Sequence, residues 1–181
     1  MSAAIIERPS RWKWLAEMLP GSIVHSSMNA FDISKDMNIM NDPELQSIGF
    51  PSAVGFGTAK SLAKLYDYLA NNGSINGKKM LSAHQVIALS TPVTQNIPVI
   101  LAPDNPYAMG TLIDTSVQGQ ITFGHRGYGG QNAFADPTNG IGVSYVTNFN
   151  GRHSETDDPR AYDLLMALYK SLQKYNNKGT Q

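Results

Sequence analysis

The stretch Phe123-Gly124-His125-Arg126-Gly127-Tyr128-Gly129-Gly130-Gln131 joins an apolar, alternating run to a dense group of glycines. An alternating run of this kind indicates a β-strand. Glycine is favoured where a backbone takes a positive φ or approaches another group closely. The stretch therefore predicts a strand that ends beside His125 and opens directly into a tight turn.

Further strands are expected on both sides of this stretch. Four short runs are rich in aromatic and β-branched residues, at residues 107–113, 120–123, 132–135 and 141–147. Turn residues separate them at Gln118-Gly119 and at Asp136-Pro137-Thr138-Asn139-Gly140, and the second of these carries a strong hairpin signal. The pattern predicts an antiparallel meander.

Helices are expected before and after these strands. Thr58 is a suitable N-cap for a periodic run over residues 59–70, and Asn71-Asn72-Gly73 ends it. Shorter helices are expected over residues 12–19 and 82–89, with a turn at residues 75–78. Asp158-Pro159 predicts the start of a last helix. Its buried stripe would be Tyr162, Leu165, Met166, Tyr169 and Leu172. Helices, consecutive strands and a closing helix indicate an α+β fold, with helices packed on an antiparallel sheet.

Composition excludes several classes of function. Fourteen basic and fourteen acidic residues cancel, and the basic ones are scattered, which argues against nucleic acid as a partner. The absence of cysteine excludes disulfides and thiolate nucleophiles. No apolar run is long enough to cross a membrane, and residues 1–8 lack the apolar region of a secretory signal. These features do not assign the protein to a cellular compartment.

His125 is the best candidate for chemistry. A neutral imidazole at a strand end could hold a substrate carbonyl or share a proton with a nucleophile. The alternative is a turn histidine that makes only a structural hydrogen bond. The other histidines, His25, His84 and His153, have no ligand-type neighbour at metal-binding spacing, so we expect neither a metal nor a cofactor.

Three Ser-x-x-Lys patterns are candidates for a nucleophile, at residues 10–13, 61–64 and 171–174. On a helix this spacing sets the lysine beside the serine, where a neutral lysine could act as base. Ser61 and Lys64 lie off the apolar stripe of their helix, and Ser171 and Lys174 lie near a polar tail. We therefore expect both to be solvated surface pairs. Ser10 has little chain before it to build a pocket.

Several segments together resemble the C-terminal part of the serine β-lactamase-like family, which includes class C β-lactamases, related esterases and penicillin-binding-protein-like hydrolases. The resemblance covers roughly residues 40 to 170 in the family's order, and the His-x-Gly strand followed by the Asp-Pro hairpin is its most specific part. The segments that carry it are Asn41–Leu45, Gly57–Tyr66, Leu69–Gly73, Tyr107–Gly110, Phe123–Gly130, Ala135–Pro137 and Gly140–Asn148.

The resemblance implies a β-lactamase/transpeptidase-like fold, here incomplete. It divides the chain into an irregular N-terminal segment at 1–40, a C-terminal portion of the domain at 41–175 and a polar tail at 176–181. His125-Arg126-Gly127 matches the family's third catalytic motif, on an edge strand opposite the nucleophile. The implied role of His125 is to support the acyl-enzyme cycle. Arg126, Gly127, Tyr128 and Gly129 would shape the substrate cleft and the oxyanion hole.

Two family motifs are missing from their expected places. The family's nucleophilic Ser-x-x-Lys and its Tyr-x-Asn lie N-terminal to everything matched here, and no Tyr-x-Asn precedes Gly57. The first hypothesis is a truncated serine hydrolase, which in complete form cleaves a small ester or amide through an acyl-serine. The second is a non-catalytic pseudoenzyme that acts as a binding or scaffold module. We also expect exposed core surface to promote self-association.

Overall fold

The computed structural model describes residues 19–21, 42–49, 55–94, 105–127, 130–147 and 158–178. The chain divides into two compact units, Met1–Phe56 and Gly57–Gln181. In the first unit a turn at residues 19–21 and the short helix α3 (Pro43–Ser47) are described. Residues 12–18 of the helix expected over residues 12–19, and the segment 22–40, lie outside the described residues. The division at residue 40 stays a prediction.

The second unit begins with helix α4 (Ala59–Ala70), and Thr58 caps it as predicted. The Thr58 hydroxyl accepts a hydrogen bond from the Ser61 backbone N–H at 3.1 Å, and the Thr58 N–H donates to Ser61 Oγ at 3.0 Å. This reciprocal capping box satisfies two backbone donors that the first helical turn leaves free. The helix ends where Gly73 takes a φ of 82° and donates to the Tyr68 carbonyl.

A small hairpin and a second helix follow. Strands β1 (Ser74–Ile75) and β2 (Lys78–Lys79) are joined by Asn76 and Gly77, with φ values of 48° and 76°. Positive φ at both central residues is what a tight hairpin turn requires. Helix α5 (Ala83–Ser90) has its own capping box between Ser82 and Gln85. The turn and the short helix predicted here are confirmed.

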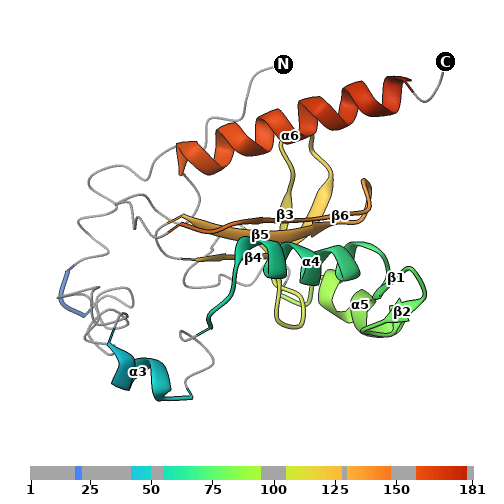
Figure 1. Ribbon diagram of the computed structural model, residues 1–181. Coiled ribbons are helices and arrows are strands. Elements are labelled where there is room, and N and C mark those ends of the chain that lie inside the picture. The colour runs from blue at the N-terminus through green and yellow to red at the C-terminus, as the bar shows by residue number, and fades with distance from the viewer. Residues whose placement is uncertain are drawn as a thin grey trace. The chain divides into compact units, whose positions relative to one another are not determined.

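Four antiparallel strands then form one sheet in the order of the sequence. They are β3 (Leu112–Thr115), β4 (Ile121–Gly127), β5 (Gln131–Asp136) and β6 (Ile141–Tyr145). Figure 1 shows this meander between α4 on one side and α6 on the other. The predicted α+β class, with helices packed on an antiparallel sheet, is confirmed.

Three predicted strand bounds are wrong. The strand expected from residue 107 begins at Leu112, because Gly110 has a φ of 104° and turns the chain. Tyr107 makes only an isolated bridge to Leu112. Strand β4 continues past residue 123 to Gly127, since its glycines pair with β5 instead of turning. At the other end of the sheet, β6 stops at Tyr145.

The core lies between the sheet and helices α4 and α5. Gly142 of β6 lets α4 approach closely, because a Cβ there would lie 2.0 Å from the Asp67 backbone nitrogen and 2.2 Å from the Ala63 carbonyl oxygen. The buried members of this core are Tyr66, Leu69, Ala70, Val86, Ala108, Ile113, Phe123, Ala133 and Ala135.

Helix α6 (Pro159–Lys178) lies over the opposite face of the sheet (Figure 1). Asp158 caps it as predicted, since its carboxylate accepts from the Arg160 backbone N–H at 2.9 Å. Tyr169, which is 1% exposed, donates its hydroxyl to the buried Asp136 carboxylate at 2.8 Å. The predicted stripe is wrong at Tyr162, which is 47% exposed, because the helix turns Ala161 inward in its place.

Candidate cleft wall at the end of strand β4

His125 lies inside strand β4, opposite Ala133, and its side chain is exposed. It shares a face of the strand with the buried Phe123, because alternate residues point the same way. Nδ1 of His125 lies 2.5 Å from the carbonyl oxygen of Arg126. A carbonyl only accepts, so Nδ1–H is the donor in this contact, and in the neutral imidazole this leaves Nε2 as an acceptor. An acceptor nitrogen is what proton sharing with a nucleophile or substrate requires.

An aromatic neighbour orients the imidazole. The ring of Tyr107 meets the His125 ring edge-on, with centroids 6.5 Å apart and planes at 62°. This T-shaped arrangement is one that aromatic pairs prefer. Tyr107 is held by its own backbone contacts, since its N–H donates to Thr94 Oγ1 at 2.7 Å and its carbonyl accepts from the Val93 N–H at 2.7 Å. The segment before β3 thus supports the histidine.

Strand β4 lies between β3 and β5 in the sheet. Strand β3 pairs with residues 121–124, whereas β5 pairs with residues 123–127. His125–Gly127 therefore pairs with β5, beyond the point where the register with β3 stops. The resemblance implied that this motif lies on an edge strand, and that expectation is wrong, because β4 is an inner strand of the four-stranded sheet.

The side chain of Arg126 lies on the other face of the sheet from His125, as strand alternation requires. It forms an ion pair with Asp114 of β3, and the two side chains are 19% and 25% exposed. Asp114 also accepts from the Asn105 amide at 3.2 Å. The structure thus brings Gly127 next to His125 in the strand but turns Arg126 toward β3. The substrate-binding role assigned to Arg126 and Gly127 stays a prediction, and Tyr128 and Gly129 lie outside the described residues.

The described Ser-x-x-Lys pairs are surface features, as predicted. Ser61 is exposed and its hydroxyl is used in the capping box of α4, where it also donates to the Thr58 carbonyl at 2.9 Å. Ser171 is exposed and donates to the Ala167 carbonyl at 2.8 Å within α6. Lys64 and Lys174 are exposed. Residues 10–13 lie outside the described residues. The part of the chain that the structure describes holds no cluster of three metal-ligand side chains.

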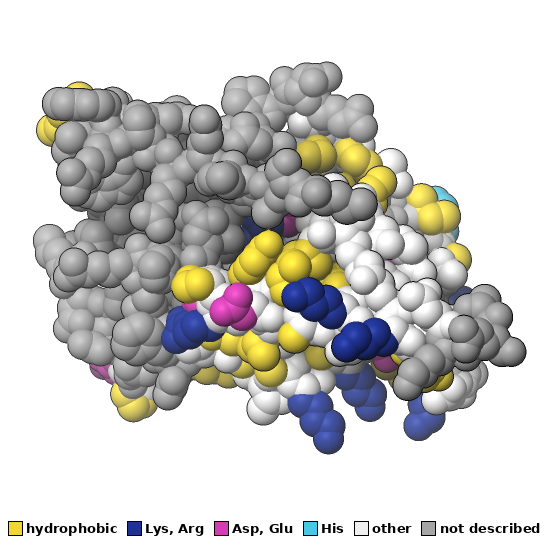
Figure 2. All heavy atoms as spheres, turned by 90° about the horizontal axis from the view of Figure 1, so that it is seen from above, with side chains coloured by type: hydrophobic (Ala, Val, Ile, Leu, Met, Phe, Trp, Pro, Cys, Tyr) yellow, Lys and Arg dark blue, Asp and Glu magenta, His cyan; other side chains and the backbone are white. Residues whose placement is uncertain are grey.

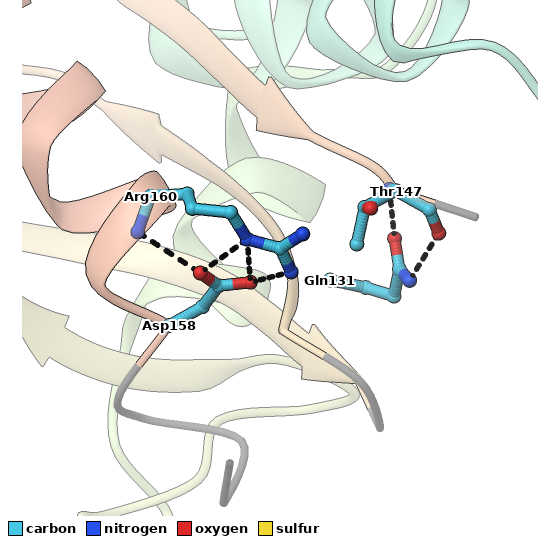
Figure 3. Close-up of polar contacts among 4 residues, drawn as sticks. All are labelled: Gln131, Thr147, Asp158 and Arg160. Carbon is cyan, nitrogen blue, oxygen red and sulfur yellow. Dashed lines mark hydrogen bonds and ion pairs between the residues drawn. The ribbon is translucent and has the colours of Figure 1, made fainter. Parts of the chain in front are cut away.

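Sequence reasoning missed two polar contacts beside the β4–β5 turn, both drawn in Figure 3. The Gln131 side chain donates to the Thr147 carbonyl at 2.8 Å and accepts from the Thr147 N–H at 2.8 Å. Asp158 binds the Arg160 guanidinium, with Nε 2.9 Å from Oδ1, and this hydrogen bond raises the pKa of Arg160. A glutamine at the start of a strand does not by itself indicate that its side chain binds the backbone 16 residues further on. The Asp158 cap was predicted, but not its ion pair with Arg160.

An antiparallel sheet with helices on both faces and a His-x-Gly segment at a strand end agree with the β-lactamase-like fold that the resemblance implied. Residues 7–167 match the Beta-lactamase family, and the chain belongs to this family. It is 32% identical over 114 residues to the esterase/beta-lactamase LipL of Mycobacterium tuberculosis, an alignment that covers 61% of this chain and 26% of LipL.

Two solved structures are similar in fold and sequence. A family VIII carboxylesterase matches with a TM-score of 0.65 and 28% identity, over 74% of this chain and 37% of that one. A penicillin-binding protein homolog from Caulobacter crescentus matches with a TM-score of 0.53 and 29% identity, over 64% and 32%. The chain therefore spans between about a quarter and two fifths of the length of these relatives.

No described helix is both long and apolar enough to cross a lipid bilayer.

Proposed function

We propose that this chain supplies one wall of the active site of a β-lactamase-related serine hydrolase. Its substrate would be a small ester or amide. In such a reaction a serine oxygen bonds to the substrate carbonyl carbon, the alcohol or amine leaves with a proton, and water then releases the acid. His125 would support this cycle by hydrogen bonding to the substrate or by sharing a proton with the reacting groups.

The observation that carries the proposal is the state of His125. Its Nδ1 faces the Arg126 carbonyl, its ring meets the Tyr107 ring edge-on, and it lies near the end of β4. A neutral imidazole whose Nδ1–H donates to a carbonyl keeps Nε2 as an acceptor, which suits proton sharing in acyl transfer. The names of the relatives, which are esterases and a penicillin-binding homolog, agree with an ester or amide as substrate.

We further propose that the acylating serine is not among the residues of this chain. Ser61 and Ser171 are engaged in hydrogen bonds to their own helices and have no buried lysine beside them. A lysine must be desolvated before it can act as the base for a serine.

The test is acylation of the purified chain by a fluorescent penicillin and, separately, by a fluorophosphonate probe, read by intact mass. We expect no covalent adduct with either reagent, and we expect the S61A and S171A variants to give the same result. An adduct that maps to any serine of the chain would contradict the proposal.

The coding sequence upstream of Met1 separates a hydrolase from a binding module. An in-frame Ser-x-x-Lys followed by Tyr-x-Asn would support a serine hydrolase of which this chain is a portion. If neither motif is encoded there, the second hypothesis, a non-catalytic scaffold that keeps the cleft wall, is favoured.

A further inference from the structure

The last three residues of β4 pair with β5. His125–Gly127 lies opposite Gln131–Ala133. Paired strand ends open together when the contacts that hold one of them are lost. Contacts that fix the start of β5 therefore also restrict the end of β4 and His125.

Gln131 holds the start of β5 from the side of β6. Its amide makes two hydrogen bonds to the backbone of Thr147, both at 2.8 Å (Figure 3). Thr147 lies two residues beyond the end of β6. The Gln131 side chain therefore adds two hydrogen bonds, like those between paired strands, beyond the last residue of β6. Gly127, opposite Gln131, leaves space for this side chain, since a Cβ there would lie 3.2 Å from Gln131 Cβ.

Asp158 holds the same turn from the side of α6. Gly130 has a φ of 92°, and a Cβ on it would lie 2.5 Å from Asp158 Oδ2. The Asp158 carboxylate is 2% exposed and is fixed by the Arg160 backbone N–H and guanidinium. The backbone of Gly130 therefore packs directly against an immobilised carboxylate.

We propose that Gln131 and Asp158 are positioning residues, which together fix the end of β4 and the orientation of His125. This inference rests on the proposed function, because it concerns the same cleft wall. It also explains the glycines at 127 and 130, which have no side chain and so leave space for Gln131 and Asp158.

The test is NMR of the ligand-free chain, with backbone amide exchange at residues 125–127 and the ring resonances of His125 as readouts. We expect Q131A to accelerate exchange at these amides by about tenfold, because both bonds to Thr147 are lost. We also expect the His125 ring shifts to change, since they report the edge-on contact with Tyr107. Q131E retains the acceptor but loses the donor, so a smaller effect is expected.

Gln118 provides the matched control. Its side chain also donates to a backbone carbonyl, that of Tyr169 at 3.2 Å, but in another part of the fold. Q118A should leave exchange at residues 125–127 and the His125 shifts unchanged. The G130A variant should displace Asp158 and so produce the same changes in exchange and ring shifts as Q131A. Its thermal midpoint, compared with that of wild type, shows whether the variant folds.

Wild-type exchange and ring shifts in Q131A, or equal changes in Q118A, would overturn the inference. If Q131A does not fold, wild-type behaviour of Q131E and G130A would overturn it in the same way. Because no ligand is used, a failure of the proposed function leaves these readouts intact, and the two failures are distinguishable.

Discussion

At the scale of single residues, Asp136 is a fully buried carboxylate that accepts three hydrogen bonds. It accepts from the Tyr169 hydroxyl at 2.8 Å, from the Asn139 side chain at 2.7 Å and from the Asn139 N–H at 3.0 Å. Sequence reasoning predicted the turn at Asp136 from its local signals. It could not predict the bond to Tyr169, because the two residues are 33 positions apart and nothing local links them.

Removing the Tyr169 hydroxyl should destabilise the chain. Y169F leaves a buried carboxylate short of one donor, and a hydrogen bond to a charged group contributes about 1.5–3 kcal/mol. We expect the free energy of unfolding, measured by urea titration, to fall by that amount. Y175F is the matched control, since Tyr175 is 78% exposed and should change stability by less than about 0.5 kcal/mol. Equal losses in both variants would contradict the assignment.

The same tyrosine predicts a loss of stability at alkaline pH. Burial, followed by the hydrogen bond to Asp136, raises the pKa of Tyr169 above the ordinary value of 10.0, and burial raises the pKa of Tyr66. The unfolded chain therefore releases these protons first as the pH rises. Their contribution is present below about pH 10 and is lost above it. Between about pH 8 and about pH 10.5, Y169F should lose less stability than wild type in urea titrations. An equal loss in both would refute this assignment.

At the scale of elements, local signals predicted most of the fold. The caps at Thr58 and Asp158 and the turn at Asn76-Gly77 depend on contacts within a few residues, so the sequence shows them directly. The extent of β4 was not predicted, because its glycines favour a turn locally while pairing with β5 keeps them in the strand. The candidate site was predicted at residues 125–129, but the contacts of Tyr107 and Thr147 beside it were not, since these residues come from distant segments.

The capping box of α4 gives a prediction about an element. T58A and S61A should each lower the free energy of unfolding by about 1 kcal/mol, because each removes one partner of the reciprocal cap. The measurement is urea denaturation followed by circular dichroism. Unchanged stability in both variants would argue against the cap.

The packing of α4 on β6 gives a second prediction at this scale. G142A places a methyl group 2.0 Å from the Asp67 nitrogen, so backbone must move, and we expect a loss of about 1–3 kcal/mol or more. G57A is the control, because its methyl group would meet only Ser61 Oγ, at 3.5 Å. The measurement is thermal denaturation of the two variants. A G142A variant as stable as wild type would contradict the close packing of α4 on β6.

At the scale of the whole molecule, several large apolar side chains of the described residues are exposed. Figure 2, seen from the side of α6, shows hydrophobic side chains at the surface among lysines and arginines. Ile87, Val93 and Met109 are 57%, 58% and 67% exposed, and the segments that carry them are joined by hydrogen bonds between backbones. Exposed apolar surface of this kind favours association.

We therefore expect the isolated chain to self-associate, in line with the sequence-based expectation. Light scattering after gel filtration should show species larger than a monomer, and I87K and M109K should reduce them. I121K, at a residue 64% exposed at the start of β4, should have a smaller effect. A monomer with a sharp, cooperative thermal transition would contradict this expectation.

Ligand binding at the end of β4 is the most direct test of the central claim, that His125 stands on the wall of a substrate cleft. The measurement is an NMR titration of the chain with benzylpenicillin, following the His125 ring and the amides of residues 125–127. The account predicts saturable shifts at these positions, with an affinity in the millimolar range, and their loss in H125A. Shifts that are absent, or that persist unchanged in H125A, would contradict it.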